Sequence, residues 1–171
     1  SGELSYSIRY DGSTVVNPSA LALDFADGCF GAGLRIISSK VTSVHDSYDL
    51  PVGKTSHVES DSRQAVIRLE EKAGLRRKLD LVVRAFNDAV AFRYEVPEQE
   101  GMKEFALKGE RMDLDFVSDA DAIVLPFKNF HNSHEGNYLK LPVSQLPADA
   151  IFDLPATFAL PAAKAGKGPV F

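Results

Sequence analysis

Apolar and polar side chains alternate with a period of two along much of this chain. Residues 4–10, LSYSIRY, place large apolar side chains at every second position, which is the pattern of a half-buried strand. The Asp-Gly pair that follows is typical of a hairpin turn, and Val15 and Val16 mark the partner strand. The chain therefore begins with a predicted β-hairpin.

Further strand patterns follow at short intervals. Residues 45–57 and the Pro-rich chain after Pro126 read as irregular, because Pro inside a strand is confined to sheet edges. Almost no segment keeps the helical period of about 3.6 residues over three turns, and only residues 70–83 could be misread as a helix. Turn signals separate the strands, which indicates an all-β sandwich or barrel of mainly antiparallel strands. We expect strands at residues 20–25, 34–44, 64–71, 75–86 and 89–96, with two or three short ones within 104–127.

The composition is that of a globular protein. Its 171 residues, 44% of them hydrophobic, are enough for one compact domain over residues 1–171. The net charge of −5 argues against nucleic acid as a partner, and no apolar run is long enough for membrane insertion. Cys29 is the only cysteine, so no internal disulfide is available. A strand pattern starts within the first residues, and the last ten residues show no pattern of a closing strand or helix. We therefore expect a fragment that is incomplete at both ends.

Two charged segments have ordinary explanations. Residues 68–80, RLEEKAGLRRKLD, mix both signs and are most simply a solvated hairpin. In the strand after residue 89, Arg93 and Glu95 share one face while Phe92 and Tyr94 share the other. A solvated face is the simple interpretation, because exposed charge pairs contribute little. The alternative is hydrogen bonding across the sheet or into a neighbouring domain.

The segment KNFHNSHEGNY, residues 128–138, carries candidate metal ligands. His131, His134 and Glu135 are residue types that bind zinc, although no HExxH or paired-Cys pattern accompanies them. The other interpretation of Glu135 is an exposed loop acid.

A sugar-facing aromatic patch is a further candidate, since aromatic rings stack on pyranose rings. Its members would be Tyr48, Phe127, Phe130 and Tyr138, and we expect core packing for most of them.

The segment RAFNDAVAFRYEVPEQ resembles a signature of the N-terminal domain of glycoside hydrolase family 97. The segments LSYSIRYDG, SALALDF and YDLPVGK resemble other parts of that domain in the same order. Ala89 and Ala22 stand where the family usually has Gly, at positions where Gly can serve a tight turn. The signature residues are Arg84, Phe86, Asn87, Asp88, Ala91, Phe92, Arg93 and Tyr94.

This resemblance implies an architecture. The chain would be a β-supersandwich, similar to galactose mutarotase, packed on a catalytic (β/α)₈ barrel that a small C-terminal β domain follows, both absent from this sequence. It implies an exported bacterial enzyme, periplasmic or secreted, that is an α-glucosidase or α-galactosidase acting on α-linked sugars.

The resemblance also implies where the chemistry lies. The catalytic carboxylates of the family belong to the barrel, so we expect this chain to be inactive alone. The Glu-x-x-Tyr of HEGNY resembles a family segment whose Glu helps to hold an active-site calcium ion, which implies Glu135 as one calcium ligand. A stand-alone sugar-binding module and a structural or dimerisation domain are the alternatives.

Overall fold

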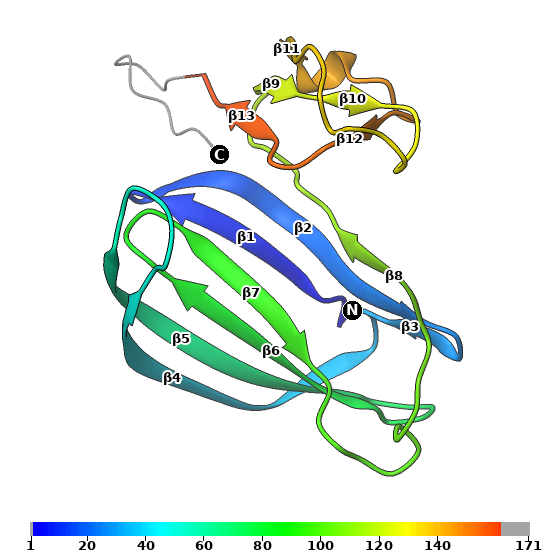
Figure 1. Ribbon diagram of the computed structural model, residues 1–171. Helices are drawn as coiled ribbons and strands as arrows, with labels where there is room; N and C mark the ends of the chain where they lie inside the picture. Colours follow the sequence, from blue (N-terminus) through cyan, green and yellow to red (C-terminus); the bar gives the residue numbers. More distant parts are fainter. Residues whose placement is uncertain (1, 162–171) are drawn as a thin grey trace. The chain divides into compact units, whose positions relative to one another are not determined.

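The computed structural model describes residues 2–161, and they form strands with one short 3₁₀ turn (Figure 1). The all-β prediction is therefore confirmed. Contacts divide the chain into two compact units, which are described separately. Among the described residues, unit 1 contains residues 2–4 and 21–111, and unit 2 contains residues 5–20 and 112–161. The expectation of one domain over residues 1–171 stays a prediction.

Unit 1 is built on a four-stranded antiparallel sheet in the order β4-β5-β6-β7. The strand β2 also pairs with β3 in antiparallel fashion and with β8. The bounds are β2 Ser13–Phe25, β3 Gly28–Phe30, β4 Leu34–Asp49, β5 His57–Glu71, β6 Lys78–Ala85, β7 Val90–Glu95 and β8 Leu107–Met112.

The expectation of an irregular segment at residues 45–57 was wrong at its two ends, although residues 50–56 are irregular as predicted. Strand β4 continues to Asp49 and β5 begins at His57, so the connection is short. The backbone N–H of Leu50 donates to the carbonyl of Ser56 at 2.9 Å. Polar side chains occupy one face of this extension and alternate with few apolar ones, so the period-two signal disappears although the backbone stays extended.

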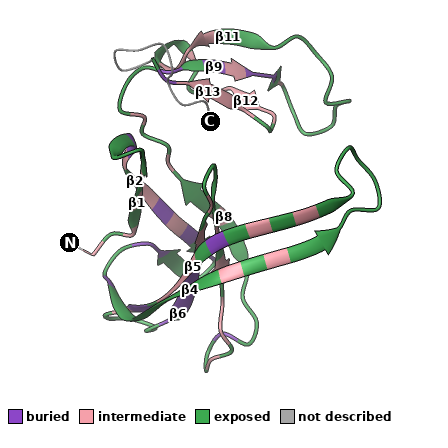
Figure 2. Ribbon diagram, turned by 90° about the vertical axis from the view of Figure 1, so that its left-hand side faces the viewer, coloured by how far each residue is buried: buried purple, intermediate pink, exposed green. Residues whose placement is uncertain are grey.

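The core of unit 1 comes from alternating positions of β2 and from β6, in which the four consecutive residues 79–82 are buried. Leu21, Leu23 and Phe25 are buried on one face of β2, and Leu79 and Leu81 are buried on β6. Figure 2 shows the contrast with the long β4–β5 hairpin, along which exposed and half-buried positions alternate. Leu75, predicted to lie in a strand, is 63% exposed and precedes β6, because the left-handed backbone of Arg76 (φ 55°) interrupts the extended chain.

Unit 2 contains the predicted N-terminal hairpin, in which β1 pairs with the first part of β2. Asp11 and Gly12 form its turn with φ values of 46° and 75°, as the Asp-Gly pair predicts. Val15 and Val16 are buried in a cluster with Ala120 and Leu160.

The chain after Pro126 is more regular than predicted, because it forms short strands. β9 is paired with β11 on one side and β13 on the other, and β10 pairs with β12. Pro142 lies in β11, an edge strand, as expected for Pro. The bounds are β1 Ser5–Tyr10, β9 Asp121–Val124, β10 Pro126–Phe127, β11 Leu139–Pro142, the 3₁₀ turn Val143–Gln145, β12 Ile151–Phe152 and β13 Thr157–Ala159.

Candidate functional site

The loop between β10 and β11 in unit 2 is braced by its own asparagines. The backbone N–H of His131 donates to Asn129 Oδ1 at 2.9 Å, and that of His134 donates to Asn132 Oδ1 at 2.7 Å. The amide of Asn132 donates to the carbonyl of Asn129 at 2.6 Å. Such side-chain contacts mimic backbone turns. The sequence KNFHNSHEGNY therefore forms an ordered set of turns around its candidate ligands.

His134 and Gly136 tie this loop to the small strands beneath it. Nδ1 of His134 lies 2.7 Å from Asp153 Oδ2, and this hydrogen bond holds the pKa of Asp153 below its ordinary value. The backbone N–H of Asp153 donates to the carbonyl of Leu125 at 2.9 Å. A Cβ at Gly136 would lie 3.0 Å from Leu125 Cδ1, so glycine permits the close approach.

Glu135 lies between these two anchors with its side chain exposed. His134 points one ring nitrogen at Asp153, and no group of three or more His, Cys, Asp or Glu side chains within residues 2–161 is arranged to hold a metal ion. The described residues therefore do not assemble the zinc site considered for His131, His134 and Glu135. A calcium ion takes six to eight oxygen ligands, and Glu135 offers one carboxylate group. Calcium at Glu135 stays a prediction that requires ligands from elsewhere.

The aromatic residues considered for a sugar-facing patch are more exposed than core packing allows. Tyr48 is 50% exposed, Phe130 74% and Tyr138 56%, so the expectation of core packing was wrong for these three. Phe127 is half-buried and makes edge contacts with the rings of Phe130, at 5.7 Å between centroids, and His134, at 6.1 Å. Tyr48 belongs to β4 in unit 1, whereas the other three belong to unit 2.

The signature segment forms the predicted hairpin of β6 and β7 in unit 1. Arg84 donates to Gln64 Oε1 at 2.8 Å and to Asp46 Oδ2 at 2.7 Å, which connects β6 to β5 and β4. Asn87 and Asp88 lie in the turn. The turn is closed by a hydrogen bond of 2.8 Å from the backbone N–H of Phe86 to the carbonyl of Ala89.

The two alanines at family glycine positions do not strain the backbone. Ala89 is not among the described residues with positive φ, so this turn accepts a side chain. Ala22 lies inside β2 and not in a turn. A Cβ at Gly31 would lie 2.6 Å from the Cβ of Ala22. The small residue that this close approach needs is therefore Gly31.

The two faces of β7 are divided as predicted. Arg93 Nε donates to Glu95 Oε1 at 2.8 Å along the same strand, on the exposed face. The bond is neither across the sheet nor to another domain. Phe92 and Tyr94 make an edge contact at 5.9 Å between ring centroids on the other face. Arg93 and Glu95 therefore form the solvated pair that the simple interpretation predicted.

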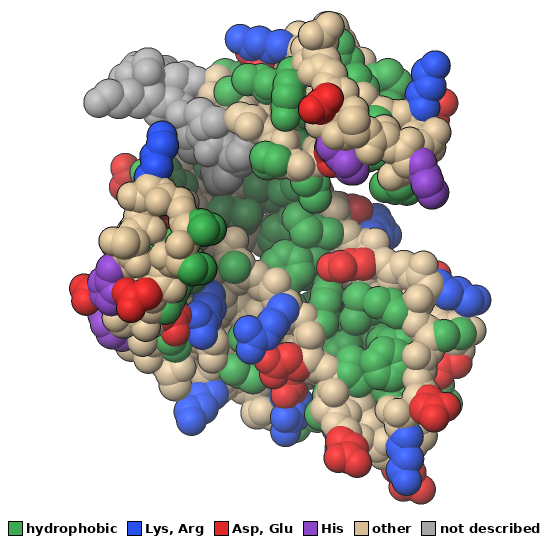
Figure 3. Space-filling model, in the orientation of Figure 1, with side chains coloured by type: hydrophobic (Ala, Val, Ile, Leu, Met, Phe, Trp, Pro, Cys, Tyr) green, Lys and Arg blue, Asp and Glu red, His purple; other side chains and the backbone are tan. Residues whose placement is uncertain are grey.

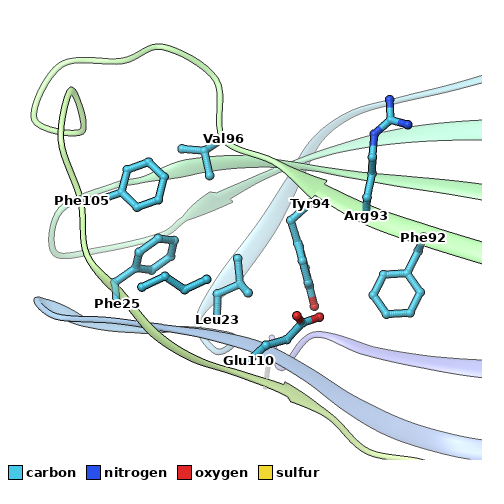
Figure 4. A pocket seen from close by; sticks show the side chains of 9 residues that line it. Leu23, Phe25, Phe92, Arg93, Tyr94, Val96, Phe105 and Glu110 are labelled. Atoms are coloured by element: carbon cyan, nitrogen blue, oxygen red, sulfur yellow. The ribbon is translucent and has the colours of Figure 1, made fainter. Parts of the chain in front are cut away.

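A cavity of about 380 Å³ lies beside β7, within unit 1. Figure 4 shows the hydroxyl of Tyr94 pointing toward the carboxylate of Glu110, which comes from β8. Hydrophobic side chains gather around this hollow, at the lower right in Figure 3. The apolar part of its lining is contributed by Leu23, Phe25, Phe92, Val96, Phe105 and Leu107.

The prediction of a solvated hairpin at residues 68–80 was wrong, because several of its charges are buried. Arg77 is 5% exposed and donates to Glu71 Oε1 at 2.6 Å and to Asp27 Oδ1 at 2.8 Å. Its guanidinium also lies 5.2 Å from the centre of the Phe25 ring. Asp80 is buried and accepts two hydrogen bonds from Arg68. Mixed charge in a sequence has the same appearance whether the charges are solvated or paired inside.

Comparison with solved structures shows which known enzymes contain a similar fold. The chain superposes on a glycoside hydrolase family 97 enzyme from Pseudoalteromonas sp. strain K8, solved with acarbose, at a TM-score of 0.81 and 25% identity over 92% of the chain and 24% of that enzyme. A variant of that enzyme solved with panose gives a TM-score of 0.82, again at 25% identity, over 93% of the chain and 24% of the enzyme. A β-arabinopyranosidase shares the fold at a TM-score of 0.74 and 24% identity, over 92% of the chain and 26% of the enzyme.

The antiparallel sheets and their similarity to those of the solved enzymes define the chain as an all-β domain of a glycoside hydrolase. The family model described as glycosyl-hydrolase 97 N-terminal matches residues 1–166, so the chain belongs to that family. It is 27% identical, over 161 residues, to a protein from Streptomyces bingchenggensis (strain BCW-1) described as a probable retaining alpha-galactosidase. That alignment covers 93% of the chain and 24% of the relative. The chain thus spans about a quarter of the length of the relatives it matches.

No helix among the described residues is long and apolar enough to cross a membrane. Cys29 is exposed and forms no disulfide.

Proposed function

We propose that this chain is the non-catalytic N-terminal domain of an exo-acting α-glycosidase, an α-glucosidase or α-galactosidase. The observation that carries the proposal is the family match over residues 1–166, together with the fact that the chain covers only 24% to 26% of the length of the reported relatives. Its work would be to support a catalytic (β/α)₈ barrel of the same polypeptide, which a C-terminal β domain completes. The enzyme would be bacterial and exported to the periplasm or the medium.

The names of the relatives support an α-linked sugar as the substrate of the whole enzyme. One relative is described as a probable retaining alpha-galactosidase, and two structures of the Pseudoalteromonas enzyme hold acarbose and panose. In a retaining enzyme, two carboxyl groups flank the glycosidic bond, and one of them attacks the sugar as a nucleophile. We place both on the barrel, so this chain alone would be inactive.

Glu135 would contribute to a calcium ion in the active site. Calcium is bound by carboxylate, carbonyl and water oxygens, and several of these would come from the barrel. The contribution of this chain would be to hold the Glu135 carboxylate in a defined position. Asn132 and Gly136 fix the backbone on either side of Glu135, and its carboxylate is exposed and available.

Hydrolysis of p-nitrophenyl α-glucoside and α-galactoside would test this proposal. The 171-residue chain and the complete polypeptide that contains it are compared, each with calcium and with a chelator. We expect turnover by the complete polypeptide alone, with loss of turnover on chelation. Turnover by the 171-residue chain would overturn the non-catalytic role, and unchanged activity with chelator would remove calcium from the proposal.

The role of Glu135 has its own test in the complete polypeptide. Glu135→Ala should weaken calcium binding and lower activity together, because one charged ligand is lost. Glu104→Ala is the matched control, since Glu104 is also an exposed acid. Calcium titrations of activity would show the two changes, and an unaltered calcium dependence in Glu135→Ala would contradict the assignment.

A further inference from the structure

Asp153 is hydrogen-bonded to the loop that carries Glu135, although it belongs to a different part of unit 2. It follows β12 directly, and its side chain is 20% exposed. Its Oδ2 lies 2.7 Å from Nδ1 of His134, the residue immediately before Glu135. An ionised carboxylate only accepts hydrogen bonds, so Nδ1 of His134 donates this one. Because β12 pairs with β10, the ring of His134 is tied to that pair of strands.

Asp153 is itself held in place by two further hydrogen bonds. Its backbone N–H donates to the carbonyl of Leu125 at 2.9 Å. Its Oδ1 accepts from the backbone N–H of Leu154, also at 2.9 Å. Since Leu154 engages one carboxylate oxygen and His134 the other, the side chain has little freedom to rotate. Asp153 therefore gives the loop a fixed point of attachment.

The backbone of His134 needs such an attachment. Its φ of 56° lies in the left-handed region, which residues other than glycine rarely adopt. A conformation of this kind persists only where the surroundings hold it. The backbone N–H of His134 is bonded to Asn132, and the ring lies 6.1 Å from the Phe127 ring between centroids. Together with Asp153, these contacts fix the direction in which the chain enters Glu135.

Leu125 connects the two sides of Glu135. It is 5% exposed, and its carbonyl is the group that holds Asp153. Its Cδ1 lies 3.0 Å from the place that a Cβ on Gly136 would occupy. His134, on one side of Glu135, is thus attached through Asp153 to the same residue against which Gly136 packs on the other side. The backbone at Glu135 is held from both directions while its side chain is exposed.

We propose that Asp153 is a positioning residue, which acts through His134 to hold the Glu135 carboxylate in the orientation that binds calcium. The inference rests on the calcium role proposed above for Glu135. Asp153 would not bind the ion itself, because His134 and Leu154 engage its two oxygens. A ligand that is already oriented loses less conformational freedom when it binds. Residues that orient metal ligands typically contribute about 10- to 100-fold to metal affinity.

The test is a calorimetric titration of the complete polypeptide with calcium chloride, after calcium has been removed with a chelator. Asp153→Ala should weaken calcium binding by about tenfold. Hydrolysis of the p-nitrophenyl glycosides should then require more calcium, and saturating calcium should restore the rate. An unchanged calcium affinity would overturn the proposal. A loss of rate that saturating calcium does not restore would also contradict it, because it would indicate general damage to the structure.

Two further variants test whether Asp153 acts through His134. Asp153→Asn keeps an oxygen that accepts from His134, so it should retain most of the calcium affinity. His134→Asn keeps a residue that tolerates the left-handed backbone but is too short to keep the ring contacts, so it should weaken binding as Asp153→Ala does. The double variant Asp153→Ala with His134→Asn should be no worse than either alone, because all three lose the same contact. Additive losses would contradict an action through His134.

Asp119→Ala is the matched control. Asp119 also belongs to unit 2, and its carboxylate accepts two hydrogen bonds from Ser144, at 3.0 Å and 2.6 Å. It should bind calcium as the unaltered polypeptide does. Urea unfolding of the complete polypeptide shows whether each variant folds, and His134→Asn decides the question if Asp153→Ala does not fold.

Glu135→Ala, titrated beside these variants, separates this inference from the proposed function. If Glu135→Ala weakens calcium binding and Asp153→Ala does not, Asp153 has no positioning role and Glu135 keeps its own. If neither variant changes calcium binding, the calcium role of Glu135 is wrong, and the role of Asp153 is wrong with it.

Discussion

Two arginine–glutamate pairs in unit 1 have nearly the same geometry and opposite surroundings. Arg77 lies 2.6 Å from Glu71, and Arg93 lies 2.5 Å from Glu95. The side chains of the first pair are 5% and 12% exposed, and those of the second are 63% and 46% exposed. Water screens the exposed pair, so its attraction is largely cancelled. Distance alone therefore does not tell which pair matters to the fold.

The buried pair also has more partners. Arg77 donates to Asp27 Oδ1 and to the carbonyl of Gly28 at 3.0 Å, in the turn between β2 and β3. Glu71 accepts from the backbone N–H of Arg77 at 3.0 Å, where β5 turns toward β6. The pair thus fastens the β2–β3 turn to the β5–β6 turn. Arg93 and Glu95, by contrast, both lie on strand β7, so their ion pair connects no separate elements of the fold.

The largest expected effect is the loss of Arg77. Arg77→Met should lower the free energy of unfolding by about 3–5 kcal/mol, because it leaves the charge of Glu71 buried without its partner. Urea unfolding of the 171-residue chain measures the change. The double variant Arg77→Met with Glu71→Leu should recover part of the loss, since it removes the unpaired charge. A loss below about 1 kcal/mol in Arg77→Met would mean that the pair is as weak as an exposed one.

Gly31 should show the next largest effect, through packing and not through charge. Gly31→Ala places two Cβ atoms 2.6 Å apart, at Ala22 and at position 31, so the chain must shift. We expect a loss of about 1–3 kcal/mol in urea unfolding. Adding Ala22→Gly should restore much of the stability, because it removes the facing Cβ. If the double variant were less stable than Gly31→Ala, the contact with Ala22 would not be the cause.

Acid should weaken the buried pair. Burial raises the pKa of Glu71, but the hydrogen bonds from Arg77 outweigh this effect and bring the pKa below its ordinary value. A carboxyl with a lowered pKa stabilises the fold above its unfolded-state pKa, and this contribution is lost as the pH falls through the folded-state pKa.

The expected result is a urea midpoint that falls as the pH drops below about 4, near the ordinary pKa of a glutamate. Glu71→Gln should start from a lower midpoint at neutral pH and lose less on acidification. Midpoints measured across the acid range for both proteins provide the check. Parallel curves would show that Glu71 does not contribute to the acid sensitivity.

The sequence predicted the fold best where apolar residues alternate with polar ones. The β1–β2 and β6–β7 hairpins follow that pattern and a clear turn, and both form as predicted. It failed at residues 45–49, where His45, Ser47 and Asp49 make one face of a strand entirely polar. Backbone pairing with β5 keeps this segment extended, and such pairing leaves no local signal in the sequence.

The burial of charged and aromatic side chains could not be predicted from the sequence either. Arg77 and Arg93 each have a glutamate partner nearby in the sequence, and only the tertiary fold decides which of the two arginines is buried. Phe130 resembled a core residue by type, yet it is 74% exposed on its loop. Asp153 gave no signal at all, because it is 19 residues from His134 in the sequence and only the fold brings the two together. Glu135 was singled out through family resemblance and not through any local pattern.

The smallest expected effect is at the exposed pair, and it completes the comparison. Arg93→Met should change the free energy of unfolding by no more than about 0.5 kcal/mol, because Glu95 is well solvated and loses little when its partner is removed. Urea unfolding beside Arg77→Met gives the two values under the same conditions. Since both pairs have similar distances, a difference of several-fold would assign the stability to burial and added partners. A loss at Arg93 equal to that at Arg77 would contradict this explanation.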